Sequence, residues 1–259
     1  MEVCYSHFGL RQYKEEEAQV KEVTISLVIP AYNEEKYIGA CLENAIKNSG
    51  GKFLEIIVID NASTDRTSEV AGTYPGVRVV KEEQKGLTWA RQRGFLEAQG
   101  DVLAWCDADT HIPSGWVEKI IQEFGKDQSL AVLSGPYTFY DIPKGQQKLA
   151  RIYWSALAMP VYWAVGYMAT GGNFAIRKSV LEKMNGFDTT IEFYGEDTNI
   201  ARRAHEFGKV KFTPSFLTYT SGRRLTGMGI FSVGFVYVAN YISEALFHKP
   251  STKKYTDIR

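Results

Sequence analysis

Two carboxylates separated by one residue follow an apolar run in the sequence WCDADT. Asp107 and Asp109 repel each other when both are ionised, and a divalent cation removes this repulsion because hard cations prefer oxygen ligands. An Mg²⁺ or Mn²⁺ ion held here could bridge the aspartates to a diphosphate and offset the charge of a leaving phosphate. A D-x-D sequence alone also fits a solvated turn, so its interpretation depends on the element that precedes it.

A second pair of acids lies in FYGEDTNIARRAHEFG, where Glu196 and Asp197 open a predicted helix. Ile200, Ala201 and Ala204 recur at the spacing of one helix face, which predicts that this face is buried. Carboxylates in the first turn complement the helix dipole, so simple capping is one interpretation. A general base for an attacking hydroxyl group is the other.

Strands and helices alternate four times in the segment that ends at the first acidic pair. The runs ISLVIP, EIIVID, VRVV and DVLAWC are predicted strands, and consecutive apolar residues such as those of EIIVID are typical of parallel strands covered on both faces. Helical segments separate them, and Gly50 and Gly51 are expected to end the first. The pattern predicts an α/β fold with a Rossmann-like, doubly wound, mostly parallel sheet and helices on both faces.

Polar residues gather where these predicted strands end, and in such sheets ligands bind beyond the carboxyl ends of the strands. The residues concerned are Tyr32, Asn33, Glu34, Asp60, Lys85, Gly86, Asp107 and Asp109. Any one of them could be a helix cap or part of a solvated turn. Their placement on one edge predicts a binding site.

The bulk composition limits the class of protein. A chain of 259 residues, 44% of them hydrophobic, can bury the core of one α/β domain with a short appendage. A formal net charge of zero gives no support for nucleic acid as a partner. Three widely separated cysteines argue against a disulfide framework or a zinc site. The N-terminus lacks the apolar core of a signal peptide, so a cytoplasmic location is expected.

Two uncharged stretches, 152–169 and 225–243, raise the question of membrane contact. Pro160 and Gly166 interrupt the first, which favours a buried or interfacial helix over a spanning one. Basic residues flank the second, which fits a helix on the cytoplasmic face of an anionic membrane, a helix packed on the sheet or a dimer contact. We expect an N-terminal arm over 1–22, an α/β domain over 23–222 and a helical segment over 223–259.

Four motifs occur in order along the chain: P-x-Y-N-E in PAYNEE, D-x-x-S-x-D-x-T in DNASTDRT, G-x-x-x-A-R in GLTWAR, and D-x-D in CDAD. Together with GGNFAIRKSVLEKMNGFD and FYGEDTNIARRAHEFG, they resemble the inverting family 2 glycosyltransferases of the GT-A fold. The resemblance covers roughly residues 24–221. Four motifs in the right order and spacing are far more specific than any one alone.

The resemblance implies a nucleotide-sugar donor, a metal ion and a set of donor contacts. Asp60 would read the base, for example the N3–H of uracil, and Asp107 and Asp109 would bind the Mg²⁺ or Mn²⁺ ion. The implied nucleotide-sugar contacts are Pro30, Ala31, Tyr32, Glu34, Asp60, Gly86, Arg91, Asp107, Gly172 and Asn173. Arg91 could instead lie in a solvated face or an internal salt bridge.

The resemblance also implies an inverting reaction in which a carboxylate deprotonates the acceptor. Asp197 is the nearest match for this base, and Glu196 is the second candidate. Arg223 and Arg224 could grip a diphosphate or an anionic acceptor, or be basic surface residues. The acceptor would be a carbohydrate, a lipid-linked sugar or a polyprenyl phosphate in cell-envelope polysaccharide or glycolipid synthesis.

Other classes remain as alternatives. A nucleotidyltransferase would usually carry a glycine-rich, lysine-bearing loop after its first strand, where this chain has PAYNEEKY. A dinucleotide-binding dehydrogenase is disfavoured because no G-x-G-x-x-G follows that strand. A non-catalytic protein that binds nucleotide sugars is the non-enzyme alternative, because a fold does not fix a function.

Overall fold

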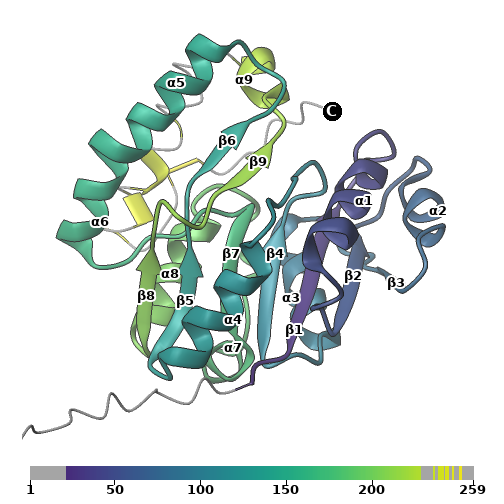
Figure 1. The fold of residues 1–259 in the computed structure, drawn as a ribbon, viewed down its shortest axis with the longest axis horizontal. Coiled ribbons are helices and arrows are strands. Elements are labelled where there is room, and N and C mark those ends of the chain that lie inside the picture. The colour runs from purple at the N-terminus through teal and green to yellow at the C-terminus, as the bar shows by residue number, and fades with distance from the viewer. Residues whose placement is uncertain are drawn as a thin grey trace, which may run out of the picture.

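The computed structural model describes residues 22–228 and, beyond them, 236, 239–241, 243, 244, 247, 251 and 252. In its first half, strands and helices alternate as the sequence predicts (Figure 1). These elements are β1 (Ile25–Ala31), α1 (Ile38–Ser49), β2 (Glu55–Asp60), α2 (Thr67–Gly72), β3 (Val77–Lys81), α3 (Leu87–Glu97) and β4 (Val102–Cys106). Helix α1 ends at Gly50, whose φ of 58° is left-handed and suits glycine.

The second half adds strands to the same sheet and a small separate one. Its elements are α4 (Trp116–Lys126), β5 (Leu130–Ser134), β6 (Tyr137–Phe139), α5 (Lys144–Tyr153), a π-helical turn (Trp154–Ala158), α6 (Met159–Val165), β7 (Asn173–Arg177), α7 (Lys178–Lys183), α8 (Glu196–His205), β8 (Lys209–Phe212), β9 (Thr218–Thr220) and α9 (Arg223–Met228). Strands β6 and β9 pair in parallel outside the main sheet.

The main sheet has seven strands in the order β3-β2-β1-β4-β7-β5-β8. Strand β7 runs antiparallel to both neighbours, β4 and β5, and the other pairings are parallel. This reversal has a direct consequence for the site. The first residue of β7 meets the last residue of β4, with Asn173 opposite Cys106.

Helices cover both faces of the sheet, which confirms the predicted architecture. Helices α1 and α4 pack on one face, where Leu42 and Phe124 join a core with Leu27 of β1. Helices α3, α7 and α8 pack on the other face, where Trp105 of β4 is fully buried. Side chains alternate between the two cores along β1, β2 and β4, as a pleated strand requires.

The first uncharged stretch, 152–169, forms the end of α5, the π-helical turn and α6. No helix within the described part of the chain is long and apolar enough to span a membrane. Most of the second stretch, 225–243, and residues 1–21 of the predicted arm lie outside the described residues.

Candidate active site

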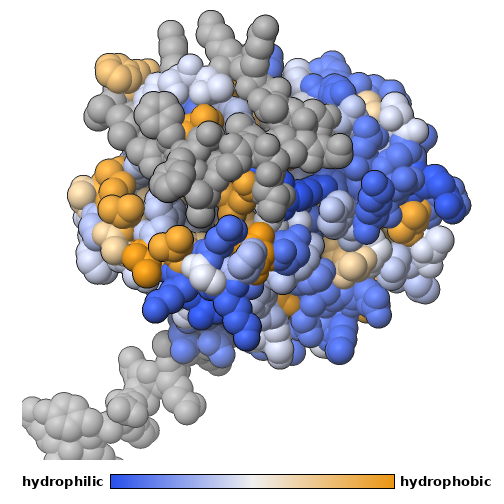
Figure 2. Space-filling model, turned by 90° about the horizontal axis from the view of Figure 1, so that it is seen from above, coloured by the Kyte–Doolittle hydropathy of each residue, from blue (hydrophilic) through white to orange (hydrophobic). Residues whose placement is uncertain are grey.

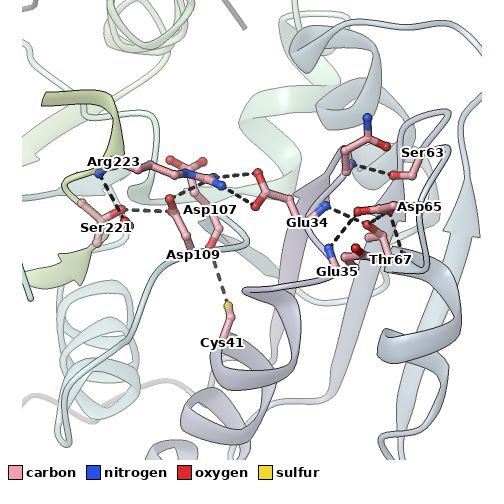
Figure 3. A network of polar contacts seen from close by, with 12 residues as sticks. Glu34, Glu35, Cys41, Ser63, Asp65, Thr67, Asp107, Asp109, Ser221 and Arg223 are labelled. Carbon is pink, nitrogen blue, oxygen red and sulfur yellow. Dashed lines mark hydrogen bonds and ion pairs between the residues drawn. The ribbon is translucent and has the colours of Figure 1, made fainter. Parts of the chain in front are cut away.

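The turn after β1 and the loop after β2 form one hydrogen-bonded unit (Figure 3). The backbone N–H of Glu34 donates to the Thr67 hydroxyl at 2.7 Å, and that of Asn33 donates to the Ser63 hydroxyl at 3.0 Å. Asp65 accepts from the N–H of Glu35 at 3.1 Å. Residues of the first two motifs therefore hold the two loops together, and the Glu34 side chain is buried.

Asp60 ends β2 beside Ala31, the last residue of β1. Its carboxylate accepts from the N–H of Ser63 at 3.1 Å and from the Ser68 hydroxyl. Tyr32 lies nearby with the Lys85 ammonium 4.0 Å from its ring centroid. The predicted base-reading aspartate thus lies at the expected edge of the sheet, fixed by its own loop.

Asn61 is a positioning residue that the sequence analysis missed. Its side-chain amide donates to the Gln84 carbonyl at 2.7 Å, and its side-chain oxygen accepts from the N–H of Gly86 at 2.7 Å. It therefore ties the end of β2 to the start of α3, where Gly86 has a φ of 146°. Its position next to Asp60 at the end of a strand could have indicated this role, but the D-x-x-S-x-D-x-T motif allows any residue there.

Asp109 lies buried at the end of the β4 segment, and its two carboxylate oxygens face different partners. One accepts from the Thr220 hydroxyl at 3.0 Å, and the other lies 3.0 Å from the Arg223 guanidinium. Arg223 also binds Glu34 through two hydrogen bonds of 2.7 and 2.8 Å (Figure 3). Burial raises the pKa of Asp109 to about 6, with Asp107 and Glu34 adding to the shift and Arg223 opposing it.

The donor set around Asp109 fits a divalent cation. Asp107, Asp109 and Glu34 are three carboxylates, and the charges of Asp107 and Glu34 both raise the pKa of Asp109, so negative charge is in excess there. Among the described residues, no group of three or more His, Cys, Asp or Glu side chains forms a metal site. An ion held by Asp109 and Asp107 would take its other ligands from phosphate and water, as Mg²⁺ commonly does.

The antiparallel strand β7 brings a glycine pair against these acids. A Cβ on Gly172 would lie 2.5 Å from the Asp107 carboxylate, so a side chain there would displace Asp107. The next residue, Asn173, is fully buried and its amide is committed to the fold. It donates to the Phe216 carbonyl at 2.6 Å and accepts from the Trp116 indole at 3.0 Å. Gly172 can therefore contact the donor as predicted, whereas the Asn173 side chain is already engaged by the fold.

The sequence predicted that Arg91 contacts the donor, but its side chain is only 1% exposed and is therefore not accessible to a ligand in this structure. Its guanidinium pairs with Glu196 and donates to the Gly171 carbonyl at 2.7 Å. It also lies 5.3 Å from the ring centroid of Phe174. The internal salt bridge that the sequence left open is what forms, and it joins α3, the glycine pair and the start of α8.

The two acids of α8 have different surroundings. Glu196 is buried against Arg91, and burial raises its pKa to about 8 despite the opposing charge of Arg91. Asp197 is half-buried and accepts from the N–H of Thr198 at 2.8 Å. Burial raises the pKa of Asp197, while backbone hydrogen bonds from Thr198 and Gly171 oppose the shift. Asp197 is therefore the acid that retains access to a ligand.

We expect the replacement Arg91→Met to lower the free energy of unfolding by about 3–5 kcal/mol, because it leaves the Glu196 carboxylate buried without its partner. Chemical denaturation measures this change. The matched control is Arg66→Met, which breaks an exposed ion pair with Glu69 and should leave the stability unchanged. Equal effects of the two variants would contradict a structural role for Arg91.

The fold and the site together define a GT-A-like α/β protein with paired aspartates at the end of a central strand. The family model "Glycosyl transferase family 2" matches residues 26–184, more than half of the chain. The chain belongs to glycosyltransferase family 2. This membership argues against the nucleotidyltransferase alternative.

Curated relatives match the chain over part of their own length. The "Probable glycosyltransferase YdaM" of Bacillus subtilis is 29% identical over 75% of this chain and 50% of its own. The dolichol-phosphate mannosyltransferase of Pyrococcus furiosus is 31% identical over 61% of this chain and 47% of its own. The chain thus spans about half the length of these relatives.

Solved structures support the fold. A mannosyltransferase from Pyrobaculum calidifontis, in complex with GDP-Man and Mn²⁺, has a TM-score of 0.64 at 18% identity, over 89% of this chain and 65% of its own. Glucosyl-3-phosphoglycerate synthase from Mycobacterium tuberculosis, with Mn²⁺, UDP and phosphoglyceric acid, has a TM-score of 0.62 at 22% identity, over 86% of this chain and 79% of its own. At these identities the likeness concerns the fold.

Proposed function

We propose that this protein is an inverting glycosyltransferase that moves a sugar from a nucleotide-diphosphate donor, most simply a UDP-sugar, to a hydroxyl or phosphate acceptor. The observation that carries the proposal is the meeting of β4 and β7. It sets the Asp107–Asp109 pair beside Gly172 and, through Gly171 and Arg91, beside the start of α8. One edge of the sheet therefore holds acids suited to a metal-bound diphosphate and an acid suited to a proton transfer.

The donor class draws support from the structural neighbours. The two reported above were solved with GDP-Man and with UDP, in each case together with Mn²⁺. Asp60 and Tyr32 would contact the base, and Asp107 and Asp109 would hold the Mg²⁺ or Mn²⁺ ion. When bound there, such an ion would neutralise charge on the departing diphosphate.

Asp197 would act as the general base. A base must lie within hydrogen-bond reach of the proton that it removes, and Asp197 is the accessible acid of the pair. Glu196 is engaged by Arg91 and would instead fix the first turn of α8. Attack from the face opposite to the leaving diphosphate inverts the anomeric centre without a covalent enzyme intermediate.

We also propose the chain's setting. The acceptor is a carbohydrate, a lipid-linked sugar or a polyprenyl phosphate in cell-envelope polysaccharide or glycolipid synthesis, reached at the cytoplasmic face of a membrane. The division into an arm over 1–22, a catalytic domain over 23–222 and a C-terminal segment over 223–259 belongs to this proposal. Peripheral contact suits the uncharged stretch 152–169.

A donor panel tests the proposed function. Binding and slow hydrolysis of UDP-, GDP- and dTDP-sugars would be measured by calorimetry and product analysis, with and without Mn²⁺. We expect metal-dependent binding of one nucleotide class together with release of the sugar. Metal-dependent binding without turnover under any acceptor condition would favour the non-catalytic binding protein. Absence of binding across the panel would refute both.

A further inference from the structure

Helices α5 and α6 present a broad apolar surface to solvent. The large side chains on it are Leu149, Ile152, Leu157, Val161 and Trp163, with exposed fractions of 56%, 50%, 61%, 38% and 70%. Figure 2 shows hydrophobic residues gathered on the left of the view, the side where α5 and α6 lie in Figure 1. We call this set the α5–α6 surface.

The opposite face of the same helices already has a partner inside the protein. Tyr153, Trp154, Met159 and Tyr162 pack around a small core that contains Phe212. The apolar residues of the α5–α6 surface are therefore not needed to fix the helices on the domain. Exposed apolar side chains gathered on one side of a molecule mark an interaction site.

The charged residues within the segment that forms this surface have one sign. No Asp or Glu occurs between Asp141 and Glu182, whereas Lys144, Lys148 and Arg151 are exposed on α5. Lys148 and Arg151 are sequence neighbours of the exposed Leu149 and Ile152. Apolar side chains bordered by cations complement an anionic lipid surface, where headgroups attract the charges and the acyl boundary accepts the apolar groups.

We propose that the α5–α6 surface docks on an anionic phospholipid membrane, with Trp163 and Leu157 entering the interface. This docking deepens the proposed function and rests on it, because it would bring the chain to a membrane that carries a lipid-anchored acceptor.

Vesicle co-sedimentation of the full chain tests this docking. We expect binding to vesicles of phosphatidylcholine with phosphatidylglycerol, and weak binding to phosphatidylcholine alone. The double variant Leu157→Ser, Trp163→Ser should lose binding at least about tenfold, because both side chains leave the interface. Lys148→Gln with Arg151→Gln should lose about tenfold on anionic vesicles only.

Matched controls separate this surface from apolar exposure in general. Leu54→Ser with Leu96→Ser removes side chains that are 53% and 66% exposed elsewhere in the fold, and it should leave vesicle binding unchanged. Donor binding should be unchanged in all these variants, so failure of docking and failure of the proposed function are distinguishable. Equal binding by the two apolar double variants would overturn the proposal. So would a dimer, seen by light scattering, that the Leu157 and Trp163 changes dissolve without any vesicle binding.

A separate observation concerns Arg223, which bridges two walls of the candidate active site. Its guanidinium binds both oxygens of Glu34 and lies 3.0 Å from Asp109 (Figure 3). It also lies over the ring of Tyr37, 4.5 Å from the ring centroid. Glu34 belongs to the turn after β1, whereas Arg223 begins α9, 189 residues later. One side chain thus spans the place where a metal-bound diphosphate would lie.

The contacts of Asp109 show that Arg223 and a metal ion would bind the same carboxylate. One carboxylate oxygen accepts from Thr220 and the other faces Arg223, so a metal ion at Asp109 must compete with the guanidinium. Glu34 is also occupied at both oxygens. We infer that Arg223 is a latch that substitutes for the metal in the donor-free site and moves to the donor phosphates when metal and donor bind together.

Mn²⁺ titration followed by electron paramagnetic resonance tests the latch without any turnover. The variant Arg223→Ala should bind Mn²⁺ about tenfold more tightly than wild type in the absence of nucleotide, because its competitor is gone. It should bind UDP with Mn²⁺ more weakly, because a phosphate contact is lost. The control is Arg224→Ala, whose guanidinium lies over Phe193.

Stability must be followed in the same samples, since Arg223→Ala leaves Glu34 and Asp109 buried without a cation. We expect Mn²⁺ alone to raise the Tm of Arg223→Ala by more than it raises that of wild type. Unchanged or weaker Mn²⁺ binding by Arg223→Ala, with no larger Tm shift, would overturn the latch. An equal gain in Arg224→Ala would overturn it as well.

Discussion

Replacement of Asp197 by Asn is expected to lower kcat by about 10²–10⁴-fold, because an amide cannot accept the acceptor's proton in the transition state. The change is isosteric, and the hydrogen bond from the Thr198 N–H can be kept by the amide oxygen. Donor affinity, measured by calorimetry with Mn²⁺, should therefore stay close to that of wild type. Steady-state transfer rates give the loss in kcat.

The dependence of activity on pH is an independent test of Asp197 as the general base. Burial raises the pKa of Asp197, and the base works only when deprotonated, so activity should fall as the pH drops through that raised pKa. This acid limb should disappear from the residual activity of Asp197→Asn. Glu196→Gln is the neighbouring control, which should cost stability more than kcat because Glu196 pairs with Arg91. A larger kcat loss in Glu196→Gln would exchange the roles of the two acids.

Replacement of Asp109 by Asn is expected to abolish the effect of Mn²⁺ on donor binding. Asp109 provides one of the two proposed carboxylate ligands, and the loss of a charged ligand from a site that also depends on phosphate should weaken binding on the order of a hundredfold. Calorimetry with UDP in the presence and absence of Mn²⁺ measures the difference.

A control for Asp109→Asn lies at the other end of the same strand. Asp101 comes just before β4, whereas the proposed metal ligands come just after it, and Asp101 accepts hydrogen bonds from the N–H and hydroxyl of Thr24, which precedes β1. Asp101→Asn should leave metal-dependent binding intact. If Asp109→Asn retained full Mn²⁺ dependence, the metal would have to bind elsewhere.

The local pattern was sufficient to predict the first half of the fold. Consecutive apolar residues in β1, β2 and β4 reflect burial on both faces, so each strand carries its own signal. The reversal of β7 was not predictable in this way. NFAIR has the same composition whichever way the strand runs, and its direction depends on the path of the forty residues that precede it.

The candidate site likewise contains residues whose positions follow from the strand pattern and residues whose positions depend on distant partners. The edge that gathers Glu34, Asp60 and Asp109 follows from strand order and was anticipated. The burial of Arg91 and the commitment of the Asn173 amide depend on partners 105 and 43 residues away, Glu196 and Phe216. From the sequence alone, a charged or amide side chain near a predicted site is interpreted as a ligand contact. Only the fold shows whether that side chain is already bound to a partner inside the protein.

The way in which residues 135–169 leave the sheet and return to it at β7 has an evolutionary consequence. Residues 135–169 leave the sheet after β5 and return just before β7, and Thr170 closes the excursion by donating to the Gly135 carbonyl at 2.7 Å. The two ends of this segment are therefore joined at the sheet, so we expect changes in its outer part, α5 and α6, to leave Asn173 opposite Cys106. Descendants of such a chain can exchange that outer part, and with it the molecules that they meet, while inheriting the acids at the sheet edge.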